Sequence, residues 1–96
     1  MILVDHLTRI SKSSLVVYII QSEVDGTYYV GFTTDINRRL TEHNQGQSTY
    51  TKAHRPYRLI YTEVYLSIKD AKAREKYIKA YKNIANFLKS RVPPTS

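Results

Sequence analysis

The stretch from Val17 to His43, VYIIQSEVDGTYYVGFTTDINRRLTEH, decides the fold of this chain. It begins within an apolar run, Leu15 to Ile20, whose β-branched residues are typical of a strand buried on both faces. The Asp25-Gly26 pair then marks a turn, and Tyr28 to Phe32 has the composition of a second strand. We therefore expect these two strands to form an antiparallel hairpin.

The register of this hairpin has two alternatives. A two-residue Asp25-Gly26 turn pairs Tyr18 with Thr33, whereas a wider loop places Tyr18 directly opposite Tyr29. Both registers put the two tyrosines on the same face, because side chains alternate along a strand. We expect only the wider loop to make the two tyrosines neighbours.

A helix is expected to follow the hairpin. Thr34 or Asp35 can cap its start, and the pattern continues to about Gln45. Gly46 then supplies a typical C-terminal stop.

The helical period sorts the side chains of this helix. At about 100° per residue, Ile36, Leu40 and His43 share one stripe. Arg39 falls at the edge of this stripe, whereas Arg38 points roughly the opposite way. Of the two adjacent arginines, only Arg39 is therefore expected to face the sheet.

The second half of the chain supplies a loop, a strand and two helices. Gln47 to Pro56 is a polar, basic loop, and Tyr57 to Leu66 alternates well enough to be a third strand. Ser67 and Asp70 resemble a capping box at the start of the longest helix. Asn83 to Arg91 forms a short terminal helix. These elements predict an α+β fold.

The chain has 96 residues and is expected to form one domain with one modest core. We assign residues 15–91 to this domain, residues 1–14 to an N-terminal arm whose structure the pattern does not define, and residues 92–96 to a tail.

The longest helix carries a carboxylate on its apolar side. Its inward stripe is expected to contain Ile68, Ala71, Glu75 and Ile78. An ionised carboxylate that faces a core is costly unless it is paired or bound to a metal. Glu75 therefore requires either a metal ion or a partner such as Arg39.

The composition narrows the class of partner. The net charge of +7 and the pI of about 9.7 favour a polyanion, usually nucleic acid, although an acidic protein or a generic basic surface are alternatives. The absence of cysteine excludes a disulfide framework, a thiolate zinc site and a cysteine nucleophile, and fits a cytoplasmic or other reducing intracellular compartment. No apolar run approaches the ~20 residues that span a membrane, and residues 1–14 make a poor signal peptide.

Basic side chains in two segments are candidates for contact with phosphate, although an ordinary solvated surface has the same composition. They are Lys52, His54 and Arg55 in the polar loop, and Lys72, Lys76 and Lys79 in the longest helix.

The polar side chains that the predicted elements direct to one place are Tyr18, Tyr29, Arg39, His43 and Glu75. Hydrolysis of a phosphodiester requires a deprotonated water, stabilisation of charge on the phosphate and neutralisation of the leaving oxygen. A carboxylate can hold a hydrated Mg²⁺, an arginine can bind the non-bridging oxygens, and tyrosine or histidine can relay a proton. This set is chemically sufficient for metal-assisted cleavage of a phosphodiester.

The same residues match the pattern of a known superfamily. Val17-Tyr18-Ile19 resembles a GIY element and Tyr29-Val30-Gly31 a YIG element, while Ala73-Arg74-Glu75-Lys76 resembles the segment of a metal-binding glutamate. Arg39 follows Tyr29 by ten residues and precedes His43 by four. The chain therefore resembles the GIY-YIG nuclease superfamily, and in particular its small standalone single-domain members, in which the nuclease module is the entire protein.

The resemblance implies a three-stranded antiparallel sheet flanked by helices, an α/β sandwich-like arrangement that agrees with the predicted elements. It also implies a role for each residue. Tyr18 and Tyr29 would line the side of the nucleophile, and one of them would orient or deprotonate the water. Arg39 would stabilise the developing charge on the phosphate, and Glu75 would hold a single Mg²⁺ or Mn²⁺. His43, where other members have tyrosine, would be an accessory acid or base.

Two positions depart from the family pattern. Val17 replaces the first glycine of the GIY element, which should leave the tyrosine in place. The late asparagine that many members carry has two candidates here, Asn83 and Asn86.

The function that these features predict is a metal-dependent endonuclease that hydrolyses DNA phosphodiester bonds in repair or recombination. No base-reading element is recognisable, so selectivity for the structure of the DNA is expected rather than for its sequence, and RNA is an alternative substrate. A partner protein could supply targeting. The alternative functions are a catalytically inactive nucleic-acid-binding module of the same fold and a structural or protein-interaction domain.

Overall fold

The computed structural model describes residues 14–91. The elements in chain order are β1 (Leu15–Ser22), β2 (Tyr28–Thr33), α2 (Ile36–Asn44), the short 3₁₀ helix η1 (Lys52–His54), β3 (Tyr57–Tyr65), α3 (Ile68–Lys79) and α4 (Ile84–Lys89). This confirms the predicted α+β fold with a three-stranded antiparallel sheet. The predicted tail and all but the last residue of the predicted arm lie outside the described residues. None of the helices between residues 14 and 91 is long and apolar enough to cross a membrane.

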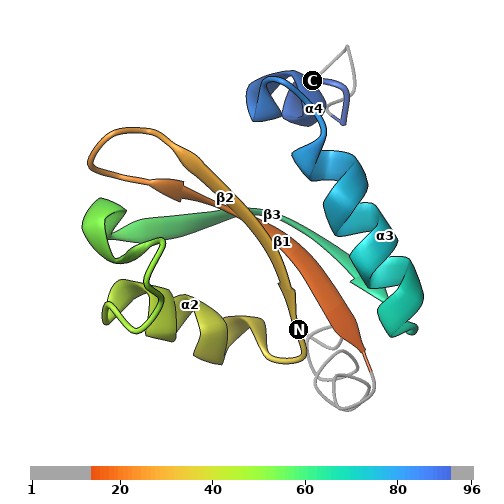
Figure 1. Ribbon diagram of the computed structural model, residues 1–96, viewed down its shortest axis with the longest axis horizontal. Coiled ribbons are helices and arrows are strands. Elements are labelled where there is room, and N and C mark those ends of the chain that lie inside the picture. Colours follow the sequence, from red (N-terminus) through yellow and green to blue (C-terminus); the bar gives the residue numbers. More distant parts are fainter. Residues whose placement is uncertain (1–13, 92–96) are drawn as a thin grey trace, which may run out of the picture.

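The strand β1 lies in the middle of the sheet, which has the order β2-β1-β3 (Figure 1). Its residues Val17 to Ile20 are almost completely buried, which confirms the prediction of a strand covered on both faces. The strands β2 and β3 are therefore the two edges of the sheet.

The hairpin adopts neither of the two predicted registers. Tyr18 pairs with Gly31, which lies between the two predicted partners Thr33 and Tyr29. The cause is the loop, which closes when the Ser22 amide donates to the Thr27 carbonyl at 2.8 Å.

Tyr18 and Tyr29 lie on the same face of the sheet, as both predicted registers required. The expectation that only the wider loop would make them neighbours is wrong. The two tyrosines are diagonal neighbours, with ring centroids 6.2 Å apart.

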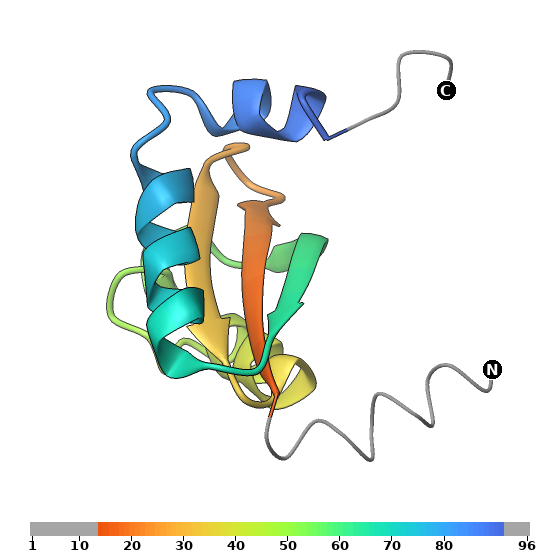
Figure 2. The ribbon, with the colours of Figure 1, turned by 90° about the vertical axis from the view of Figure 1, so that its right-hand side faces the viewer.

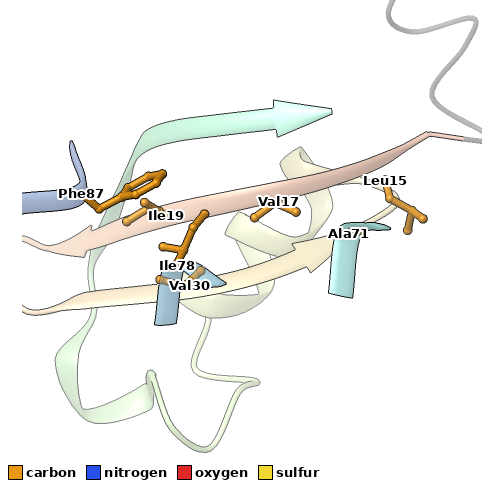
Figure 3. Packing of buried hydrophobic residues seen from close by; sticks show 7 residues of the cluster. All are labelled: Leu15, Val17, Ile19, Val30, Ala71, Ile78 and Phe87. Atoms are coloured by element: carbon orange, nitrogen blue, oxygen red, sulfur yellow. The ribbon is translucent and has the colours of Figure 1, made fainter. Parts of the chain in front are cut away.

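Alternation along β1 divides the core between two layers. The side chains on one face pack against α3 and α4, and this cluster contains Leu15, Val17, Ile19, Val30, Ala71, Ile78 and Phe87 (Figure 3). The side chains on the other face pack against α2, and this cluster contains Tyr18, Ile20 and Tyr57 with Val16, Tyr29, Ile36 and Leu40 at its border. Figure 2 shows α3 running along the β2 side of the sheet.

The helix α2 has the limits that the sequence predicted. Asp35 caps its start by accepting a hydrogen bond from the Arg38 amide at 3.1 Å. Gly46 follows its end with a φ of +79°, the left-handed conformation that glycine adopts without strain.

The inward stripe of α3 differs from the prediction at its first residue. Ala71 and Ile78 are fully buried, but Ile68 is 58% exposed. Ala71 and Ile78 define the centre of the stripe, and at ~100° per residue Ile68 lies about 70° from that centre. Arg74 and Glu75 lie about 50° to either side of it.

A polar network fixes the Arg74 side of α3 to β3. The Arg74 guanidinium donates to both carboxylate oxygens of Glu63, at 2.7 and 3.0 Å. The hydroxyls of Tyr61 and Tyr65 donate to the same carboxylate. Burial raises the pKa of Glu63, but these hydrogen bonds outweigh burial and lower the pKa to about 2. Because Arg74 is held against β3, Glu75 is turned toward the opposite side of the helix.

Candidate active site

The side chain of Tyr18 crosses the edge strand β2 at Gly31. A Cβ atom on Gly31 would lie 2.7 Å from the Tyr18 hydroxyl oxygen and 3.1 Å from Cε2 of Tyr29. Any side chain larger than hydrogen would collide with the Tyr18 ring, which is rigid beyond Cβ. The glycine therefore makes room for the ring of Tyr18, which starts from the central strand, to lie over β2, and Tyr18 remains almost completely buried there.

His43 of α2 forms a hydrogen bond with the hydroxyl of Tyr18. Its Nε2 lies 2.9 Å from that hydroxyl, and its Nδ1 lies 2.7 Å from Oγ1 of Thr51. Both His43 and Thr51 are completely buried. Burial, together with the charge of nearby Arg39, lowers the pKa of His43 to about 4, so the imidazole is neutral at physiological pH. A neutral imidazole donates from one nitrogen and accepts at the other, which orients the whole chain of hydrogen bonds.

Arg39 approaches Tyr18 from α2. Its side chain is 32% exposed, whereas that of Arg38 is 61% exposed, which confirms the predicted difference between the two helix faces. Nη1 of Arg39 donates to a Glu42 carboxylate oxygen at 2.9 Å, which fixes one side of the guanidinium to the helix. Part of the Arg39 side chain therefore remains accessible beside the Tyr18 hydroxyl.

The charge of Glu75 acts on Tyr18 from α3, which packs on the other face of the sheet. Burial raises the pKa of Tyr18 to about 12, while Arg39 lowers it and the negative charge of Glu75 raises it. The Tyr18 hydroxyl is thus electrostatically coupled to a guanidinium from one layer and to a carboxylate from the other.

The partner of Glu75 is Lys79, not Arg39. Nζ of Lys79 lies 3.0 Å from Oε2 of Glu75, and the Glu75 side chain is 21% exposed. Lys79 lies one helical turn after Glu75, so its flexible stem can fold back to the carboxylate.

The carboxylates of this region do not form a multi-ligand metal cage. Among residues 14–91, no group of three or more histidine, aspartate or glutamate side chains is arranged to hold a metal ion. A single accessible carboxylate is the donor set that fits a Mg²⁺ or Mn²⁺ ion that keeps most of its waters and is shared with a phosphate. Glu75 fits that limited role once Lys79 moves aside.

Two of the predicted phosphate-contacting residues of the loop, His54 and Arg55, contact other parts of the chain and hold the loop in place. Nδ1 of His54 lies 2.7 Å from a carboxylate oxygen of Asp25, which joins η1 to the tip of the hairpin. Hydrogen bonds from Thr27 and from His54 keep the pKa of the Asp25 carboxyl well below its usual range. The Arg55 guanidinium lies against Gly46, where a Cβ atom would be only 1.8 Å from Nη1.

The basic side chains Lys52, Lys72 and Lys76 are exposed. Contact of phosphate with these three lysines, and with His54, Arg55 and Lys79, stays a prediction.

The late asparagines do not both remain candidates. The Asn83 side chain accepts a hydrogen bond from the Ala85 amide at 2.8 Å and thereby caps α4. Asn86 lies exposed within α4. The position of an asparagine in the site therefore stays open only for Asn86.

Sequence reasoning missed two residues that the structure brings to the site. Thr51 supports His43, and Tyr50 packs on Tyr29 with ring centroids 5.6 Å apart. Both lie in a loop without periodicity, so no periodic pattern indicates that the loop folds back over α2. The only available signal was a tyrosine within an otherwise polar segment.

Comparison with known proteins identifies the family of the chain. The family model of the GIY-YIG catalytic domain matches residues 14–86. The UPF0213 protein of Staphylococcus aureus strain Mu3 and the UPF0213 protein SA0446 of strain N315 are each 44% identical over 66 residues, which cover 68% of this chain and 79% of the relative. The solution NMR structure of the UPF0213 protein BH0048 from Bacillus halodurans aligns with a TM-score of 0.51 at 30% identity, over 81% of this chain and 83% of that one.

The fold is therefore that of a nuclease-like domain. The chain belongs to the family of GIY-YIG catalytic domains, and its similarity is to the small UPF0213 proteins within that family. Membership in this family implies a nucleic-acid substrate.

Proposed function

We propose that this protein is a metal-dependent endonuclease that hydrolyses DNA phosphodiester bonds and selects the structure of the DNA rather than its sequence. The observation that carries the proposal is the position of the Tyr18 hydroxyl, which is coupled to Arg39 on one side and to Glu75 on the other. A phosphate at this edge of β2 would meet a cation, a carboxylate and a hydroxyl in one place, which is the set that phosphodiester hydrolysis requires.

Each residue has a distinct part in this proposal. Arg39 binds the non-bridging oxygens of the phosphate, because its fork of donors suits that geometry. Tyr18 orients the attacking water. Its raised pKa keeps it protonated, and His43 fixes the direction of its hydroxyl. His43 itself is a positioning residue rather than an exchanger of protons with the substrate, because its two ring nitrogens are occupied by the hydroxyls of Tyr18 and Thr51.

Glu75 is the residue that would hold Mg²⁺ or Mn²⁺. When bound there, the ion would neutralise charge on the phosphate and on the leaving oxygen. The chain's own contribution is to keep the Glu75 carboxylate on the Tyr18 side of α3, which the contact between Arg74 and Glu63 supports from the other side of the helix.

Binding of nucleic acid without cleavage is a second candidate function, and one contact favours it. Lys79 already neutralises Glu75 at 3.0 Å, so a metal ion must displace a positive charge before it can bind. Removing the lysine distinguishes the two functions. If Glu75 is a metal site, Lys79→Met should tighten binding of Mn²⁺ by about two- to fivefold, the worth of an exposed ion pair. Paramagnetic broadening of amide signals around Glu75 would report this binding without any need for catalysis.

The test of the proposal uses labelled linear, flapped and four-way-junction DNA with Mg²⁺, with Mn²⁺ and with a chelator. Metal-dependent cleavage that favours a branched substrate and is absent from Glu75→Ala supports the endonuclease. Binding that weakens steeply with salt but never leads to cleavage supports the second function. Absence of both binding and cleavage would contradict both.

A further inference from the structure

An aromatic cleft lies next to the candidate active site, at the open edge of β2. It encloses about 350 Å³. Its walls include Tyr28 and Tyr29 from β2, Tyr50 from the loop after α2, Lys79 from the end of α3, and Tyr81 from the segment that follows α3. Two of these residues, Tyr29 and Lys79, also contact the residues of the candidate active site. The cleft and the catalytic cluster are therefore parts of one continuous surface.

The walls of the cleft come from both faces of the sheet. Tyr28 and Tyr29 are consecutive in β2, so their side chains point to opposite faces and the cleft curves around the strand edge. Tyr28 packs against the core under α3, and the Tyr81 ring lies 5.2 Å from that of Phe87. These contacts to the core hold two walls of the cleft in fixed positions.

Tyr50 differs from the other tyrosines of the cleft because it does not pack against the hydrophobic core. It is 63% exposed, and its ring packs at a tilt of 36° on the ring of Tyr29. The centroid of its ring also lies 6.1 Å from that of His54. An exposed aromatic ring beside a cluster of charged groups offers a free face to a flat partner.

We propose that this cleft binds one unpaired nucleobase of the substrate, next to the phosphate that is cleaved. The proposal rests on the proposed function, because it places the base and the phosphate of one strand on neighbouring parts of the same surface. Every base has a π-face that stacks on tyrosine, so such a subsite would select an unpaired base without reading its identity. The volume lies at the low end of small-ligand pockets and suits a group of nucleotide size.

The proposal also specifies the class of substrate. A base within an intact duplex is stacked on its neighbours and paired, and it can enter a side pocket only after it is extruded. Single strands, flaps and bulges present such a base at little cost. The Lys79 ammonium, held at the border between the cleft and Glu75, is placed to meet the phosphate that connects the bound base to its neighbour.

The test measures binding in the presence of a chelator, so that no DNA is cleaved. Three fluorescently labelled hairpin duplexes would be compared by anisotropy. One has a single unpaired adenine, one has an abasic nucleotide at that position, and one is fully paired. Because stacking of one base on aromatic side chains commonly changes affinity by an order of magnitude, wild type should bind the adenine bulge about tenfold more tightly than the abasic bulge.

Two variants of Tyr50 make the test specific. Tyr50→Ala should remove the preference for the adenine bulge, whereas Tyr50→Phe, which keeps the ring, should retain it. The control is Leu66→Ala, which removes another exposed apolar side chain after β3 at the opposite edge of the sheet and should retain the preference.

Equal affinity of the wild type for the adenine and abasic bulges would overturn the subsite, and so would a preference that survives in Tyr50→Ala. Absence of binding to all three hairpins would overturn it as well. Cleavage with Mg²⁺ is scored separately. A preference for the unpaired base without cleavage contradicts the endonuclease alone, and cleavage without this preference contradicts the subsite alone.

Discussion

The Tyr18 side chain lies directly over Gly31 of the neighbouring strand, so closely that a Cβ atom on Gly31 would stand 2.9 Å from Cζ of the tyrosine ring. The pairing of these two residues in the sheet puts the ring across an edge strand, on the face that packs against α2. Gly31 thereby makes room for the ring over the edge strand, where the buried Tyr18 hydroxyl meets His43 and Arg39.

Gly31→Ala should displace the Tyr18 ring. We expect a loss of about 1–3 kcal/mol of unfolding free energy from overpacking, and a larger relative loss of cleavage because the hydroxyl leaves its place between Arg39 and Glu75. Urea denaturation gives the first quantity and the cleavage rate the second. In a double-mutant cycle with Tyr18→Leu, most of the stability cost should disappear, since the collision is then removed. A cost of the same size in both backgrounds would contradict the assigned contact.

Arg39→Ala should reduce the cleavage rate by on the order of a hundredfold or more, as expected when a group that stabilises developing charge is removed. Arg38→Ala is the matched control, because Arg38 also contacts Glu42 but points to solvent. We expect its rate to stay within about threefold of wild type, since an exposed ion pair contributes little. Single-turnover cleavage of labelled DNA measures both rates, and a larger loss for Arg38→Ala would disprove the assignment of the helix faces.

His43 should remain neutral over the physiological pH range. Its pKa in the folded protein is about 4, below the ordinary value of 6.5, because it is buried beside Arg39. The unfolded chain therefore binds more protons between these two values, and stability should fall as the pH falls from about 6.5 to about 4. NMR signals of the His43 ring should stay in the neutral form from pH 8 to pH 5. A titration midpoint near 6.5 would contradict the buried hydrogen-bond chain.

Glu63→Gln should cost about 2 kcal/mol of unfolding free energy at neutral pH, because it removes the carboxylate that holds Arg74 and two tyrosine hydroxyls. The pKa of Glu63 is lowered from 4.5 to about 2 in the folded state, so its contribution is complete above pH 4.5 and is lost as the pH falls through about 2. The difference between wild type and variant should shrink over the same range. A constant difference down to pH 2 would show that the charge of Glu63 is not responsible.

The local elements of this fold could be predicted because local features specify them. The apolar run of β1, the Asp35 cap of α2 and the glycine that ends it each act within a few residues of the chain. The helical period likewise placed Arg39 and Arg38 on different faces of α2. Neither prediction required knowledge of the tertiary structure.

The missed features depend on contacts between distant parts of the chain. The register of the hairpin follows from a hydrogen bond that closes the loop at Ser22, and not from the turn pair itself. The exposure of Ile68 follows from the rotation of α3 about Ala71 and Ile78. The packing of Tyr50 on Tyr29 requires a loop to fold back over the sheet, for which no periodic pattern exists.

One measurement tests whether the cluster at the edge of β2 cleaves DNA. It compares the single-turnover cleavage rates of the wild type, Glu75→Gln and Asp70→Asn on one flapped, labelled DNA with Mg²⁺. Asp70 is the matched control, because it is an exposed acidic residue in the first turn of the same helix. We predict that the wild type and Asp70→Asn cleave the DNA, and that Glu75→Gln loses at least about a hundredfold in cleavage rate. Equal rates for all three proteins, or no cleavage by any of them, would contradict it.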